Sequence, residues 1–60
     1  MEKRLLEDQR KQIFEALVGA QDQGMTVPRS IKLVAERFGV TEGQVRQIEQ
    51  EGLTNDWPPL

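Results

Sequence analysis

Two short helical patterns separated by a glycine place the strongest constraint on the fold of this 60-residue chain. Apolar side chains recur at the three- and four-residue spacing of a helix that buries one face. They are Ile31, Val34, Ala35 and Phe38 before the glycine, and Val40, Val45 and Ile48 after it. Gly39 stands where a tight turn requires a positive φ, and Thr41 with Gln44 has the spacing of a capping box that begins a helix. Two helices joined by such a turn form a helix-turn-helix, and we predict this motif over residues 28–53.

The residues before this motif predict one long helix over residues 1–23, with no proline and with no glycine before Gly19. Its apolar side chains spread over roughly 220° of the helix surface, against a stripe of about 100° in an ordinary surface helix. Because one small neighbour covers too little of such a face, the helix packs either against the chain's own tail or against a second copy. We therefore expect a dimer or partner interface that includes the only tryptophan. Its predicted residues are Leu5, Leu6, Ile13, Phe14, Leu17, Val18 and Trp57.

The end of the chain predicts an extended tail over residues 54–60. Proline disfavours the helical conformation in the residue before it, so a helix cannot continue past Trp57. This apolar tail either folds back over the first helix or serves as a polyproline-type docking peptide for another protein. The whole sequence thus predicts a single all-α domain: a long N-terminal helix, a helix-turn-helix and an extended C-terminal tail.

The composition argues against several classes of function. The chain has no Cys and no His, so we expect neither a metal site nor a cofactor. Ser30 is the only serine, and without a histidine to activate it we expect that the protein is not an enzyme. No apolar run approaches the length of a membrane span, and no signal peptide is recognisable. We expect a cytoplasmic protein that does not bind membranes.

The outer face of the third predicted helix favours contact with DNA. If Val45 and Ile48 point into the core, the opposite face is free to enter the major groove. Arg46 can form two hydrogen bonds with guanine, and Gln47 or Gln50 can do so with adenine. Residues near the start of this helix and on the preceding helix are placed to contact phosphates. The predicted DNA-binding residues are Arg29, Ser30, Lys32, Thr41, Glu42, Gln44, Arg46, Gln47 and Gln50.

The string from Val34 to Glu49, VAERFGVTEGQVRQIE, resembles the helix-turn-helix of conserved region four in bacterial primary sigma factors. The segment VRQIE, followed by Gly52, is especially similar to that family's recognition helix. The similarity covers residues 30–53 and does not extend to the first helix. It implies binding to a promoter element and contact with RNA polymerase or activators, and Arg46 matches a family position that contacts DNA, as does Gln47.

The charge distribution opposes this interpretation. Eight basic and ten acidic residues give a net charge of −2, whereas nucleic-acid-binding proteins usually carry a positive face. Between residues 41 and 52, the single basic residue Arg46 stands against Glu42, Glu49 and Glu51. Arg46 also has the spacing to form ion pairs with Glu42 or Glu49 on its own helix.

Two functions therefore remain open. The chain is either a small helix-turn-helix transcriptional regulator that binds double-stranded DNA, as a homodimer, or a protein–protein interaction module. In the second case the sigma-like motif no longer binds DNA and docks on a transcription component such as RNA polymerase.

Overall fold

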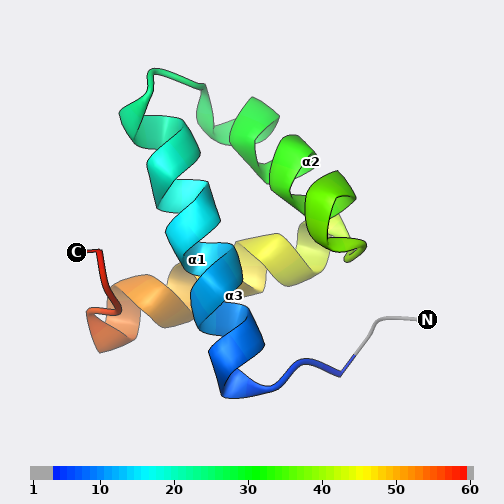
Figure 1. Ribbon diagram of the computed structural model, residues 1–60, viewed down its shortest axis with the longest axis vertical. Coiled ribbons are helices and arrows are strands. Elements are labelled where there is room, and N and C mark those ends of the chain that lie inside the picture. Colours follow the sequence, from blue (N-terminus) through cyan, green and yellow to red (C-terminus); the bar gives the residue numbers. More distant parts are fainter. Residues whose placement is uncertain (1–3, 60) are drawn as a thin grey trace.

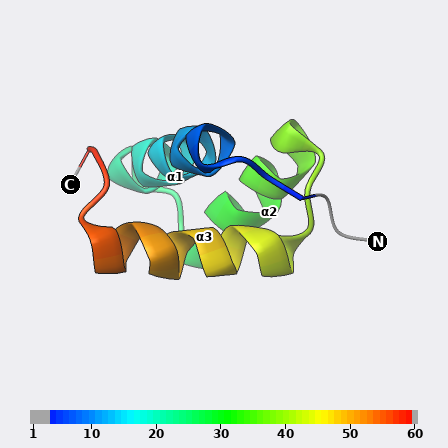
Figure 2. The same cartoon turned by 90° about the horizontal axis from the view of Figure 1, so that it is seen from below.

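A computed structural model describes residues 4–59 and contains three helices within them. They are α1 (Glu7–Asp22), α2 (Val27–Phe38) and α3 (Glu42–Asn55). Each helix packs against both others, and α1 crosses in front of α3 at a steep angle (Figure 1). Viewed from below, α3 lies along one side of the molecule and α1 along the opposite side (Figure 2). The expected all-α class is confirmed. Within the described part of the chain, no helix combines the length and apolar character that crossing a bilayer requires.

Helix α1 is shorter than predicted. The prediction began it at residue 1, whereas Leu6 has an extended backbone and the helix begins at Glu7; residues 1–3 lie outside the described residues. The side-chain oxygen of Gln9 accepts a hydrogen bond from the Leu6 backbone N–H at 2.8 Å, which satisfies a donor at the helix start. Glu7 and Asp8 in the first turn favour this N-terminus through the helix dipole.

The turn between α2 and α3 has the predicted chemistry. Gly39 ends α2 with φ 66°, and the Val40 N–H donates to the carbonyl of Ala35 at 3.0 Å. Thr41 and Gln44 form the predicted capping box: the Thr41 hydroxyl accepts from the Gln44 N–H at 3.0 Å. The Gln44 side chain accepts in return from the Thr41 N–H at 3.1 Å. Because both signals act over a few residues, the start of α3 is as predicted.

Helix α3 runs further than predicted, to Asn55. The expectation of an extended chain from residue 54 is therefore wrong for the last turn of this helix. Asp56 ends α3 in the left-handed conformation with φ 51°, and the Trp57 N–H donates to the carbonyl of Gly52 at 3.0 Å. Gly52 does not end the helix but lies buried within it, because it is the point at which α3 approaches the ring of Phe14 on α1.

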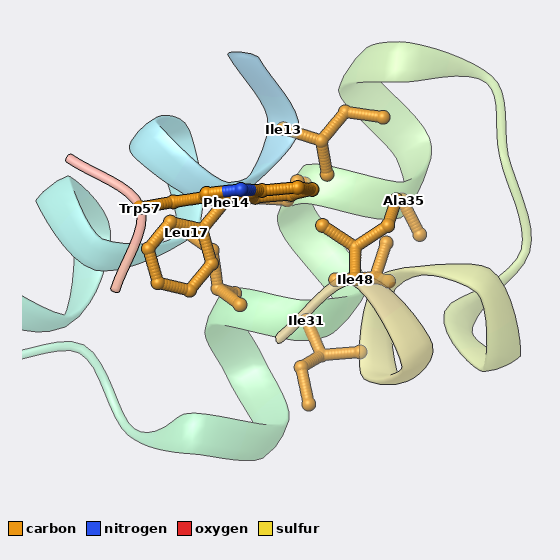
Figure 3. Packing of buried hydrophobic residues seen from close by; sticks show 9 residues of the cluster. Ile13, Phe14, Leu17, Ile31, Ala35, Ile48 and Trp57 are labelled. Carbon is orange, nitrogen blue, oxygen red and sulfur yellow. The ribbon is translucent and has the colours of Figure 1, made fainter. Parts of the chain in front are cut away.

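The core draws on all three helices and on the tail (Figure 3). Its buried apolar residues are Ile13, Phe14, Leu17, Ile31, Val34, Ala35, Val45, Ile48 and Trp57. The rings of Phe14 and Trp57 meet edge to face, with centroids 6.1 Å apart and planes at 81°. The tail thus folds back onto α1, the first of its two predicted roles.

This packing corrects the predicted interface on α1. Ile13, Phe14, Leu17 and Trp57 are buried within the single chain, so they are not exposed for a second copy. Leu5 and Val18 are half-buried and pack against the same core, and Leu6 alone of the set is exposed. Within the single chain, α2, α3 and the returning tail cover Ile13, Phe14 and Leu17.

Candidate nucleic-acid interface

The outer face of α3 presents the residues that the sequence analysis assigned to it. Val45 and Ile48 are buried, whereas Arg46, Gln47 and Gln50 are exposed. Residues four positions apart lie one turn apart on the same side of a helix, so Arg46 and Gln50 form a continuous polar row. The remaining exposed residues along this side are Glu42, Gly43, Leu53 and Thr54.

The acidic residues of α3 divide between two faces. Glu51 is half-buried and accepts two hydrogen bonds from Arg10 of α1, at 2.8 Å and 3.1 Å. Glu49 is half-buried as well and accepts a hydrogen bond from the side-chain amide of Gln21, also on α1, at 3.4 Å. Both carboxylates therefore point toward α1. The outer face retains Glu42 as its single exposed carboxylate, and Glu49 is half-buried at its edge, where it lines a hollow with Arg46 and Gln50.

Arg46 does not form the ion pairs that its spacing allows. Among the described residues, ion pairs join Arg10 to Glu51 and Lys11 to Glu7. Arg46 instead borders a shallow hollow between α3 and the first turns of α2. The hollow is lined by Val27, Pro28, Ile31, Arg46, Glu49 and Gln50. Sequence reasoning did not associate Val27 and Pro28 with Arg46, because only the crossing of the two helices brings them together.

Of the three DNA contacts predicted on α2, Arg29 and Lys32 are exposed and Ser30 is not. Ser30 is fully buried; its hydroxyl donates to the carbonyl of Val27 at 2.8 Å and accepts from Gln21 at 3.1 Å. It cannot reach a phosphate, because it lies where α1 and α2 pack together. No local sequence signal distinguishes this serine from an exposed one.

Two residues at the start of α3, which were predicted both to cap the helix and to contact DNA, form the capping box. Gln44 is buried, and its side chain closes the capping box, so it is withdrawn from the set of DNA contacts. Thr41 is exposed, and its hydroxyl caps the helix by accepting from the Gln44 N–H. Among the described residues, no group of three or more His, Cys, Asp or Glu could hold a metal ion.

No protein family model, curated protein or solved structure matches this chain. The resemblance to region four of sigma factors therefore rests on residues 30–53 alone.

Proposed function

We propose that the protein is a small helix-turn-helix DNA-binding protein, a transcriptional regulator of the cytoplasm, in which α3 enters the major groove. The observation that carries this proposal is the division of charge on α3. Because Glu49 and Glu51 are engaged with α1, the outward face combines one arginine and two glutamines with one exposed carboxylate. That face is compatible with DNA, although the sequence of the helix is acidic.

The side chains on this face suit direct contacts with bases. Arg46 is suited to guanine, and Gln47 or Gln50 to adenine, because each pairs through two hydrogen bonds in the major groove. Arg46 and Gln50 are about 6 Å apart along the helix axis, enough to contact different base pairs.

Positively charged and polar groups beside this face suit the phosphates. Lys32 and Arg29 are exposed on α2, and Thr41 is exposed at the start of α3. In helix-turn-helix proteins the first helix of the motif crosses the backbone, which is where these groups would lie.

The test is an amide-resolved NMR titration with mixed-sequence duplex DNA at about 50 mM and about 200 mM salt. We expect shifts on the outer residues of α3 and around Arg29 and Lys32, and we expect these shifts to fade at the higher salt. Shifts confined to α1, or shifts that do not depend on salt, would contradict the proposal.

A second candidate function is a protein–protein interaction module that docks on a transcription component. Two half-exposed apolar side chains favour it, Leu53 at the end of α3 and Val27 at the start of α2, with exposed fractions of 50% and 49%. The same titration separates the two functions. If no amide shifts with DNA even at low salt, the outer face of α3 becomes the candidate surface for a protein.

A further inference from the structure

A groove lies between α1 and α2. It is lined by Ala16, Gly19, Ala20 and Gln23 of α1 and its end, by Met25, and by Leu33, Val34 and Arg37 of α2. The groove is open above Gly19, since a Cβ built on this residue would have no atom within 4 Å. Gly19 and Arg10 are nine positions apart and so about 180° apart around α1. Because Arg10 binds α3, Gly19 and the groove beside it face away from α3.

One edge of this groove carries an apolar side chain that the chain leaves exposed. Leu33 of α2 is 46% exposed, and Arg37 follows it one turn later on the same side of the helix. Leu33 is therefore an apolar projection at the edge of a hollow with a mixed polar and apolar lining, and it does not fill that hollow within one molecule.

The two helices that border the groove have opposite charges on their outer sides. On α1, Asp8, Glu15 and Asp22 are exposed at seven-residue intervals, so they form one row next to Gly19. None of the three forms an ion pair with a described residue. The exposed side of α2 is basic, with three cations against one carboxylate; these residues are Arg29, Lys32, Glu36 and Arg37.

We propose that a second copy of this chain closes the groove. In this two-fold dimer, Leu33 of each copy enters the groove of the other above Gly19, and Arg37 of each copy faces the acidic row of the opposite α1. A two-fold interface requires one surface that is complementary to itself. The groove region meets this requirement in two ways. Leu33 lies beside the groove that it would fill in the other copy, and the basic side chains of α2 lie beside the acidic row of α1.

The dimer has a consequence that rests on the proposed DNA binding. Because the groove faces away from α3, the two copies of α3 lie on opposite outer faces of the dimer. The dimer then holds two separate DNA segments instead of two neighbouring half-sites on one face of a duplex.

The test is sedimentation equilibrium of the full chain without DNA, up to about 1 mM protein. We expect a dimer for the unmodified chain and for Leu53→Glu, whose leucine is equally exposed but lies on α3. We expect Leu33→Glu to be a monomer with unchanged helical circular dichroism. A monomeric unmodified chain, or a Leu33→Glu variant that still dimerises, would overturn the proposal, and so would loss of the dimer in Leu53→Glu.

A second variant decides the matter if Leu33→Glu does not fold. Gly19→Gln adds a side chain at the groove, where its Cβ meets no atom within 4 Å in the single chain, and glutamine favours a helix more than glycine does. We expect a folded monomer with an equal or higher melting temperature, and a folded dimer would contradict the proposed contact. Since these measurements contain no DNA, their failure and the failure of the DNA titration are distinguishable.

Discussion

Arg10 and Glu51 join α1 to α3 through a bidentate ion pair, with Nε–Oε1 at 2.8 Å and Nη2–Oε2 at 3.1 Å. The third nitrogen of the guanidinium donates to the carbonyl of Leu5 at 2.7 Å, so the pair also secures the segment before α1. Paired hydrogen bonds of this kind fix orientation as well as distance. The pair therefore links α1 to α3 in a defined orientation, and it holds Glu51 away from the outer face of α3.

Arg10→Ala is expected to lower the free energy of unfolding by about 1 kcal/mol, a value that reflects the one-third exposure of both side chains. Urea denaturation of Arg10→Ala, Glu51→Ala and the double variant gives the coupling energy. The Lys11–Glu7 pair serves as a control because it is more exposed, with a 3.3 Å separation within one helix. Its coupling should be only about 0.3 kcal/mol. Equal coupling energies for the two pairs would show that the bidentate geometry of the Arg10–Glu51 pair adds no stability.

Replacing Gly52 or Gly19 with alanine should change the free energy of unfolding in opposite directions. In Gly52→Ala the new methyl group clashes with the ring of Phe14, so we expect a loss of about 1–3 kcal/mol despite the better helix propensity. In Gly19→Ala the methyl group meets no atom within 4 Å, so we expect a gain of about 0.5–1 kcal/mol. Thermal and urea unfolding at low protein concentration measure both changes. A Gly52→Ala variant as stable as the unmodified chain would disprove the close approach of α3 to α1.

Local signals in the sequence predicted α2, the turn and the start of α3. Gly39, Thr41 and Gln44 act on backbone groups within a few residues, so their effect is visible in the sequence alone. The beginning of α1 was missed, because a helix-favouring composition does not reveal that Gln9 bonds the N–H of Leu6 and that the helix begins only at Glu7.

The charge on the candidate site could not be predicted in the same way. Glu51 is neutralised by a residue 41 positions away and Glu49 is bonded by one 28 positions away. Nothing near either glutamate indicates these partners, since the crossing of α1 and α3 alone brings them together. The burial of Ser30 likewise comes from packing between helices, in this case of α1 against α2.

Arg46→Ala is expected to weaken DNA binding by about 1–3 kcal/mol and to relax the preference at one base pair. Arg37→Ala is the matched control, because it removes the same charge from an exposed position beside the groove between α1 and α2. Fluorescence anisotropy with a labelled duplex, repeated over a panel of sequences, measures both effects. If the two variants lose the same affinity and keep the same sequence preference, Arg46 does not contact a base.

Glu42→Gln should strengthen DNA binding, because Glu42 is the single exposed carboxylate on the outer face of α3. Removing its repulsion of the phosphates should raise the affinity roughly threefold at about 50 mM salt, with a smaller gain at about 200 mM. The control is Glu15→Gln, an identical change at an exposed site on α1, away from α3. The duplex titration measures both variants. Because both variants lose one negative charge, the difference between their DNA affinities reports the effect of where that charge lies. An equal gain in both variants would mean that DNA responds to overall charge only, and α3 would lose its assignment as the DNA-contacting helix.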